Sequence, residues 1–348
     1  MQIGIVGLPN VGKSTLFNAL TKLQVDASNF PFCTIDPNVG TVAVPDDRLQ
    51  KLTALYDSKK TVPVVIEFVD IAGLVAGAHK GEGLGNKFLS HIRSVDAICQ
   101  VVRGFSDTNV IHVNGKVDPD ADKQTITLEL IFADLATVER RLSDTRPKAK
   151  SGDKESTRLV SVYEKVKKLL DGGAVLSEAG LTPEEKRDIA DLHLLTMKPM
   201  LYVMNVDEDS VTQERPGYLV ISAKIESELA QMNEADAHEF LQSLGLQKTG
   251  LERLIVSSYQ LLDLVTFLTA GPDETRAWTV TRGSTAPQAG GKIHSDFEQR
   301  FIRAEVTNWK DLLACGGEQG AREKGKTRIE GKTYIVQDGD VIYFRIGG

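Results

Sequence analysis

Cysteine is scarce in this chain, and its three cysteines, Cys33, Cys99 and Cys315, are far apart. They form no CxxC pair, which argues against a zinc site or a disulfide framework and fits a reducing compartment. No run of eighteen apolar residues occurs, so we expect no membrane-spanning helix. An apolar strand pattern begins at Ile3 without a basic segment or cleavage site before it, so we expect no secretory signal. These absences predict a cytoplasmic protein that does not bind membranes.

Strong charge of one sign is also missing. Hydrophobic residues make up 41% and charged residues 26% of the chain, as in ordinary globular proteins. The net charge of −7 disfavours non-specific nucleic-acid binding by the whole molecule. Between Arg276 and Gly348, however, 12 Lys/Arg residues stand against 9 Asp/Glu residues. This mildly basic tail fits an RNA contact, and it equally fits an ordinary mixed surface.

The length of 348 residues predicts two or three domains. Short apolar runs with strand character recur along the chain, and helical stretches lie between several of them. This alternation predicts an α/β fold with a mostly parallel sheet covered on both faces. The expected strands are Gln2–Val6, Val39–Val44, Val64–Val69, Ala97–Val102, Met200–Asn205 and Tyr218–Ser222, with a helix at Lys13–Leu23 after the first.

The alternation breaks between about Leu128 and Leu195. Apolar residues there recur at spacings of three and four, which is typical of two helices packed as an antiparallel coiled-coil hairpin. We expect an inserted helical arm, while helices that merely cover the sheet are the alternative. A later helix should begin at Thr182–Pro183. The predicted seam residues are Leu128, Ile131, Leu135, Val138 and Leu142 in one helix and Leu159, Val162, Val166 and Leu169 in the other.

After about Leu264 the pattern changes again, to a small α+β module. We therefore expect a nucleotide domain of residues 1–126 and 197–264, a helical arm of residues 127–196 and a C-terminal domain of residues 265–348. Asp338–Asp340 should form a tight turn between two strands. The expected strands of this module are Trp278–Gly283, Ile302–Val306 and the run Lys332–Ile346.

The stretch GLPNVGKST, Gly7 to Thr15, matches the phosphate-binding pattern G-x-x-x-x-G-K-S. It follows a strand and opens a helix, which is the context that the motif requires. Backbone N–H groups and the helix N-terminus should surround the phosphates. Lys13 should neutralise the β- and γ-phosphates and act in catalysis, and Ser14 should bind Mg²⁺. The expected loop contacts are Asn10, Val11, Gly12, Lys13, Ser14 and Thr15.

Three further residues are candidates around the γ-phosphate. Asp70 follows an apolar strand within D-x-x-G and should hold the Mg²⁺ shell, although an acidic helix cap would look similar. Gly73 allows a backbone N–H to approach the γ-phosphate closely. Thr34, in the segment NFPFCTIDP, should complete the Mg²⁺ site with its hydroxyl.

These motifs resemble the Obg-related P-loop NTPases and, among them, the YchF or Obg-like ATPases. The resemblance extends over essentially the whole chain, through NFPFCTIDPNVG, FVDIAGLVAGAHKGEGLGNKFLSHIR, NVDE, APQAGGKIHSDFEQRFIRAE and YIVQDGDVIYF. It implies a Ras-like nucleotide domain, an inserted coiled-coil arm and a C-terminal TGS domain of ubiquitin-like fold. It also implies ribosome-associated ATP hydrolysis, with the large ribosomal subunit as the expected partner.

The base-reading motif departs from that of GTPases. Asn205-Val206-Asp207-Glu208 stands where a GTPase has N-K-x-D, so Glu208 replaces the guanine-reading Asp and Val206 replaces the Lys. A displaced carboxylate leaves guanine donors unpaired, which can change the preference tenfold or more. By resemblance, this motif implies ATP over GTP, with Asn205 contacting the base. Asp207 as a shifted guanine reader is the alternative. Ser222, Ala223 and Lys224 form the later base loop.

The residue that orients the attacking water is not evident from the motifs. Ras-type enzymes place a glutamine directly after D-x-x-G, but here that residue is Leu74. Resemblance points to His112 as the catalytic histidine, while His79 is a second loop histidine and an idle solvated histidine is the alternative. Asn10 suggests K⁺ beside the phosphates as a second ion besides Mg²⁺. It also fits a residue that only shapes the loop.

Two functional classes remain: a ribosome-bound NTPase switch and a metabolic kinase that uses the same phosphate loop. A kinase needs an acceptor pocket and usually an arginine-rich lid, and no separate lid segment is evident. We therefore favour the switch, acting as a monomer, with the arm and the TGS-like domain contacting RNA or ribosomal protein. The RNA-contact candidates, which equally fit solvated surface, are Lys292, Arg300, Arg303, Lys324, Lys326 and Arg328.

Overall fold

The computed structural model describes residues 1–24, 36, 38–71, 86–107 and 117–347. The chain divides into two compact units. The first comprises Met1–Val42 and Glu67–Leu254, and the second comprises Ala43–Ile66 and Ile255–Gly348. Residues 43–66, which the sequence assigns to the nucleotide domain, therefore group with the C-terminal residues. The long helical insertion groups with the first unit.

The first unit is built on a sheet with strand order β2-β4-β1-β5-β6-β7. β1 pairs in parallel with both β4 and β5, so the strand order reverses direction at β1. Ligands of parallel α/β sheets bind at such a switch point, beyond the carboxyl ends of the strands. The strands are β1 (Gln2–Val6), β2 (Val39–Ala43), β4 (Val65–Asp70), β5 (Ala97–Arg103), β6 (Met200–Asn205) and β7 (Leu219–Ile221).

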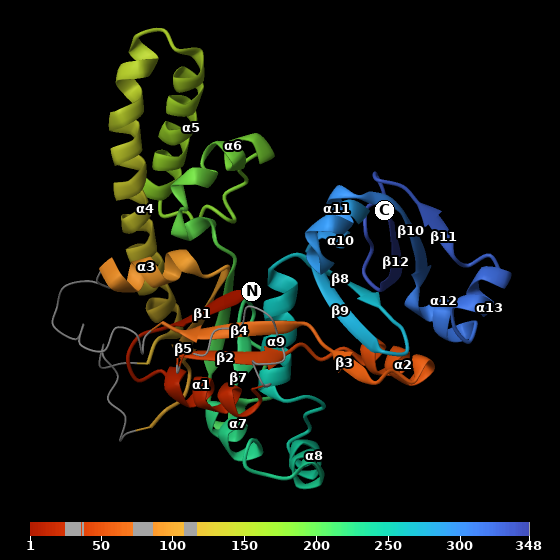
Figure 1. The fold of residues 1–348 in the computed structure, drawn as a ribbon. Helices are drawn as coiled ribbons and strands as arrows, with labels where there is room; N and C mark the ends of the chain where they lie inside the picture. Colours follow the sequence, from red (N-terminus) through yellow and green to blue (C-terminus); the bar gives the residue numbers. More distant parts are fainter. Residues whose placement is uncertain (25–35, 37, 72–85, 108–116, 348) are drawn as a thin grey trace. The chain divides into compact units, whose positions relative to one another are not determined.

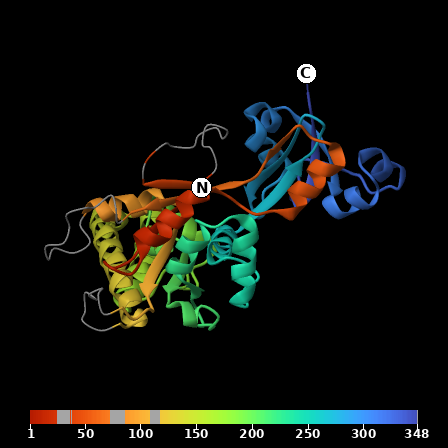
Figure 2. The same ribbon diagram turned by 90° about the horizontal axis from the view of Figure 1, so that it is seen from below.

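Helices pack against this sheet through an apolar core. Val6 and Ile98 of the sheet cluster with Phe88 and Ile92 of α3 and with Ile126 of α4. Figures 1 and 2 accordingly show α3 and α4 next to each other. Among the described residues, no helix is both long and apolar enough to cross a membrane. The helical elements of this unit are α1 (Lys13–Lys22), α3 (Asn86–Ser94), α4 (Pro119–Lys150), α5 (Lys154–Asp171), α6 (Pro183–Asp188), η3 (Ala190–Leu192), η4 (Leu195–Met197), η5 (Glu208–Ser210), α7 (Ala223–Leu229) and α8 (Glu234–Ser243). The next helix, α9 (Gly250–Leu261), is divided between the two units after Leu254.

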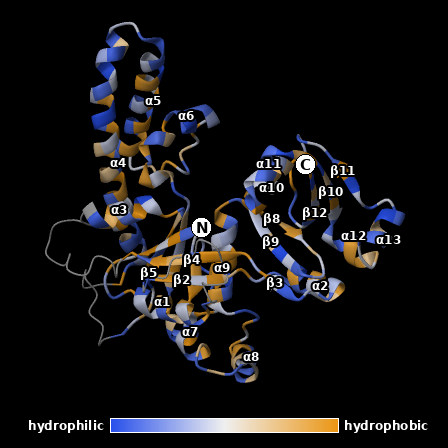
Figure 3. Cartoon of the chain, viewed as in Figure 1, coloured by the Kyte–Doolittle hydropathy of each residue, from blue (hydrophilic) through white to orange (hydrophobic). Residues whose placement is uncertain are grey.

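α4 and α5 form a long helical pair, with polar outer surfaces in Figure 3. α4 ends at Lys150, Gly152 turns the chain with φ of 93°, and Asp153 caps α5 by accepting from the Ser156 N–H. The seam buries Ile131, Val138, Leu142, Val162 and Val166 as predicted, and Leu135, Leu159 and Leu169 are partly buried against it.

Leu128 does not belong to this seam. Its side chain is 46% exposed, whereas Ile126 and Leu130 are buried against the sheet. The reason is a difference in length, since α4 has 32 residues and α5 only 18. The first turns of α4 therefore pack on the sheet rather than on α5. α6 begins where predicted, because Thr182 and Glu185 form a reciprocal capping box with Pro183 in the first turn.

The second unit has a sheet with strand order β11-β10-β12-β8-β9-β3. Its core joins Phe267, Val280, Phe301, Val306 and Phe344. α2 and β3 belong to this unit, and Figure 2 shows α2 beside β9. The elements are α2 (Asp47–Tyr56), β3 (Lys60–Val62), β8 (Leu264–Thr269), β9 (Glu274–Thr281), α10 (Ala286–Ile293), α11 (Ser295–Gln299), β10 (Phe301–Asn308), α12 (Trp309–Ala314), α13 (Glu318–Glu323), β11 (Arg328–Glu330) and β12 (Asp340–Ile346).

The prediction of a strand run through Lys332–Ile346 is wrong in its first half. Only β12, from Asp340 onward, is a strand. Before it, Ile335 forms an isolated bridge with Thr285, and Gly339 turns the chain with φ of 84°. A left-handed glycine in this turn redirects the chain into β12, so DGD starts a strand instead of joining two.

Candidate nucleotide-binding site

The loop between β1 and α1 has the backbone of a phosphate cradle. Asn10 and Gly12 both adopt left-handed conformations, with φ of 63° and 93°. Asn and Gly are the residues that reach this region at least cost. α1 begins directly at Lys13, and Gly12 offers no side-chain cap to its first turn. The N–H groups of that turn are thus directed toward an incoming anion.

The Lys13 side chain lies within the phosphate loop. Its side chain is buried, and its Nζ donates to the Leu8 carbonyl at 2.6 Å. Burial lowers the pKa of Lys13 to about 8, and the negative charge of Asp70 opposes this shift. Asp70 ends β4 opposite Ile5 of β1 and is also buried. The structure thus brings Lys13 and Asp70 together, as the motifs predict, while Ser14 and Thr15 are exposed at the start of α1.

Asn205 joins two loops that are far apart in the sequence. Its Nδ2 donates to the Val11 carbonyl at 3.0 Å, and its Oδ1 accepts from the Ala223 N–H at 2.9 Å. A Cβ atom at Gly12 would lie 2.2 Å from this Nδ2, so only glycine fits there. Asn205 therefore fixes the phosphate loop relative to the later base loop.

The other residues of the base motif have distinct environments. Val206 is buried in an apolar cluster, so its side chain offers no polar group to a base. Glu208 is partly exposed, and its Oε2 accepts from Lys224 Nζ at 3.0 Å. This contact raises the pKa of Lys224 and keeps it charged. Ser222 is fully buried, and its Oγ has no hydrogen-bond partner within the described part of the chain.

Asp207 makes a contact that the motifs do not reveal. Its Oδ2 accepts from the Ser106 N–H at 3.0 Å and from the Ser106 hydroxyl at 3.2 Å. The segment Gly104–Asp107 follows β5, so the base motif also contacts a third loop. No sequence signal marks Ser106, because a single serine after a strand has many ordinary explanations.

Several predicted site residues lie outside the described residues. They are Thr34, Gly73 and His112, together with the second loop histidine, His79. The described site thus contains the phosphate loop, Asp70 and both base loops.

Comparisons with known proteins identify the family. Residues 2–130 match a family model described as 50S ribosome-binding GTPase, and residues 264–347 match the model of the YchF GTPase C-terminal region, described as a protein of unknown function. The chain is 54% identical to the ribosome-binding ATPase YchF of Bacillus subtilis (strain 168), over 99% of each chain. The chain belongs to the YchF family. Its α/β fold with a P-loop is therefore that of a GTPase-like nucleotide-binding protein.

Two further comparisons with YchF proteins span the chain. The ribosome-binding ATPase YchF of Haemophilus influenzae is 50% identical over 99% of this chain and 98% of that protein. The solved structure of the Schizosaccharomyces pombe YchF GTPase is 37% identical, with a TM-score of 0.89 over 99% of this chain and 97% of that one. The names of these YchF relatives thus differ between ATPase and GTPase.

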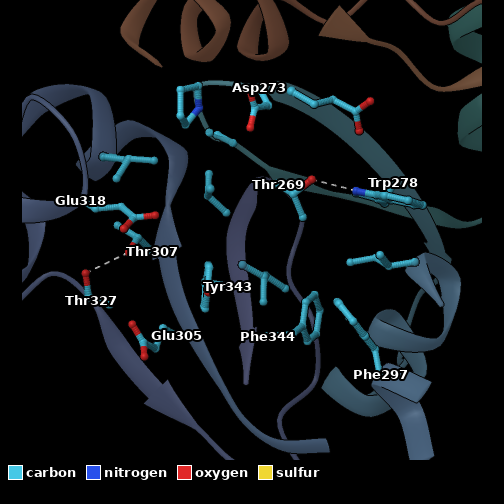
Figure 4. A pocket seen from close by; sticks show the side chains of 18 of the residues that line it. Thr269, Asp273, Trp278, Phe297, Glu305, Thr307, Glu318, Thr327, Tyr343 and Phe344 are labelled. Carbon is cyan, nitrogen blue, oxygen red and sulfur yellow. Dashed lines mark hydrogen bonds between the residues drawn. The ribbon is translucent and has the colours of Figure 1, made fainter. Parts of the chain in front are cut away.

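A cavity of about 440 Å³ lies in the C-terminal unit of this YchF chain. Figure 4 shows Trp278, Phe297 and Phe344 toward one end and Glu305 and Glu318 toward the other. Glu305 accepts from Arg345 at 2.9 Å and from Arg322 at 2.8 Å, and these arginines lower its pKa. The charge of Glu305 is therefore already balanced, and the residues that line the cavity include none from the nucleotide motifs.

Proposed function

We propose that this chain binds ATP at the loop Gly7–Thr15 and hydrolyses it to ADP and phosphate. The loop backbone and the α1 N-terminus would bind the phosphates, and Lys13 would neutralise them. Mg²⁺ suits the donor set, because the Asp70 carboxylate and the Ser14 hydroxyl are hard oxygen ligands. Thr34 would add a third oxygen, and Gly73 a backbone N–H toward the γ-phosphate. Asn10 would take part in holding K⁺, as the second ion.

The contact between Glu208 and Lys224 carries the preference for ATP. Guanine presents two donors, N1–H and the 2-amino group, and GTPases meet them with both oxygens of one carboxylate. Here Lys224 already occupies one oxygen of Glu208, at 3.0 Å. Adenine presents one donor and one acceptor, which match the remaining carboxylate oxygen and the ammonium group. A guanine donor left without its partner would cost about 1–3 kcal/mol.

The test is a titration of ATP and GTP with Mg²⁺ on the wild type, Glu208→Asp and Asp209→Ala. We expect the wild type to prefer ATP, and Glu208→Asp to weaken or reverse this preference because the shorter side chain separates from Lys224. Asp209→Ala removes a neighbouring exposed carboxylate and should leave the preference unchanged. Clear GTP preference of the wild type would support the alternative function, an Obg-type GTPase with the same architecture.

His112 is the proposed catalytic histidine, since Leu74 replaces the water-orienting glutamine of Ras-type enzymes. His112→Ala should slow hydrolysis and leave ATP binding intact. Turnover at the wild-type rate would exclude this role. Hydrolysis rates compared in K⁺ and Na⁺ buffers test the second ion, because equal rates would remove the K⁺ site from the mechanism.

The remaining residues would link hydrolysis to the ribosome. We propose that α4 and α5 form a coiled-coil arm inserted into the nucleotide domain and that residues 265–348 form a TGS domain of ubiquitin-like fold. Relatives named as ribosome-binding support a ribosomal partner, with the large subunit and RNA as the expected contacts of a cytoplasmic monomer. Co-sedimentation with ribosomes tests this proposal. Binding that is insensitive to salt would argue against the RNA contact.

A further inference from the structure

The segment after β5 is attached to the base motif at two points. The Gly104 N–H donates to the Asn205 carbonyl at 2.7 Å. Two residues later, the N–H and the hydroxyl of Ser106 donate to Asp207 Oδ2 at 3.0 Å and 3.2 Å. Residues 104–106 therefore run beside residues 205–207, joined through Gly104 and Ser106.

Arg103 also contacts the same segment. This arginine ends β5 and is only 2% exposed. Its Nε donates to the Phe105 carbonyl at 3.1 Å, and its Nη2 donates to the Asp107 carbonyl at 3.0 Å. The guanidinium also lies 4.3 Å from the centre of the Phe105 ring. The segment is therefore attached to a buried arginine by two hydrogen bonds and to Asp207 by two exposed ones.

The residues of the base motif on either side of Asp207 contact the two loops of the proposed nucleotide site. Asn205 binds the phosphate loop and the Ala223 N–H, and Glu208 binds Lys224. Asp207 lies between these two residues in the sequence, and its Oδ2 accepts from Ser106, while its negative charge also helps to raise the pKa of Lys224 in the base loop. A base seated against Glu208 would fix the turn that carries Asp207 and thereby fix Ser106.

We infer that Asp207 is a positioning residue that couples occupation of the base site to the segment Gly104–Asp107, which precedes His112 in the sequence. This inference rests on the proposed ATP hydrolysis for its effect on turnover. The contact itself does not depend on hydrolysis. Because Asp207 Oδ2 accepts from Ser106 of the third loop, we expect removal of this carboxylate to leave the choice between ATP and GTP unchanged.

Hydrogen exchange tests the coupling without any turnover. In the wild type, a non-hydrolysable ATP analogue should slow exchange of the Ser106 amide further, because the nucleotide holds the turn that accepts its hydrogen bond. In Asp207→Ala, that amide should exchange about 5- to 10-fold faster, in line with the loss of one exposed hydrogen bond. The analogue should then no longer slow it. Asp209→Ala, which removes an exposed carboxylate from the same turn, is the matched control.

Kinetics of the same variants provide the second readout. For Asp207→Ala we expect kcat to fall about 3- to 10-fold, with an ATP/GTP ratio of kcat/KM within twofold of the wild type. Asp207→Asn keeps one acceptor oxygen and should recover part of kcat, and Ser106→Ala should add no loss in the Asp207→Ala background. Wild-type exchange of the Ser106 amide in Asp207→Ala, or a large change in the ATP/GTP ratio, would overturn the inference. A wild type that does not hydrolyse ATP would instead refute the proposed function, and the exchange result would still decide the coupling.

Discussion

Replacing Asn205 by alanine should destabilise the first unit and weaken nucleotide binding together. The Asn205 side chain is 7% exposed and links Val11 in the phosphate loop to Ala223 in the base loop. Alanine removes both hydrogen bonds and fills none of the space. The side chain that fixes the distance between the two loops is then lost. A nucleotide must contact both loops, so its affinity should fall as well.

The magnitude follows from the groups that alanine leaves behind. Val11 is 0% exposed and Ala223 is 3% exposed, so the Val11 carbonyl and the Ala223 N–H lose their partners in a buried setting. Each such group costs about 1–3 kcal/mol. Partial entry of water lowers the sum, so we expect a loss of about 2–4 kcal/mol in unfolding free energy. Asn205→Asp is the isosteric control, which keeps the acceptor for Ala223 and directs an oxygen at the Val11 carbonyl.

Urea unfolding followed by circular dichroism measures this loss. Both tryptophans, Trp278 and Trp309, lie in the second unit, so their fluorescence reports on that unit and not on the nucleotide site. A native tryptophan spectrum of the variant shows that the second unit is folded. Titration with a fluorescent ATP analogue then compares nucleotide affinity.

Two results would refute this reasoning. A loss below about 0.5 kcal/mol for Asn205→Ala would mean that water replaces both hydrogen bonds without cost. An Asn205→Asp protein as stable as the wild type would mean that the donor to Val11 contributes nothing. Either outcome would remove Asn205 as the residue that joins the loops.

Three further predictions concern single positions. Burial lowers the pKa of Lys13 to about 8, and phosphates bind its ammonium form, so ATP affinity measured by calorimetry should fall up to about tenfold per pH unit above pH 8. The ATP affinity of Lys13→Met should not change with pH over this range, and a wild-type affinity that is equally independent of pH would contradict the prediction. Gly12→Ala should abolish nucleotide binding in the same titration, because the added Cβ would lie 2.2 Å from Asn205 Nδ2 and the φ of Gly12 is +93°. Wild-type ATP affinity of this variant would show that the loop accommodates the Cβ atom. Asp134→Ala should lower the free energy of unfolding in urea by about 2–4 kcal/mol, because the fully buried Asp134 accepts from the Thr196 N–H at 2.8 Å and from the Thr196 hydroxyl at 2.7 Å. Asp134→Asn should lose less stability. Equal losses in the two variants would mean that the charge of Asp134, and not its hydrogen bonds, stabilises the protein.

Much of the candidate site was predictable from sequence because its signals are local. Gly12 and Lys13 belong to one continuous loop, and the backbone conformation that the loop needs is encoded by its own residues. Asp70 and Asn205 end strands, and strand ends in a parallel sheet meet at one edge. The seam of the helical pair was predictable for the same reason, since helical spacing directs side chains to one face.

Tertiary structure decided which of these local features meet. Leu128 has the spacing of a seam residue but lies beyond the reach of the shorter α5, and no local pattern encodes the length of a partner. The sequence does not reveal that residues 43–66 group with the C-terminal unit, or that Lys224 takes one oxygen of Glu208. Asp207 is a single residue of the base motif. Its contact with Ser106, 101 residues earlier in the sequence, exists only because β5 and β6 are neighbours. The sequence by itself therefore determined which chemical groups each loop can offer. The order of the strands determined which loops lie together, because contacts between distant residues depend on the packing of the whole sheet.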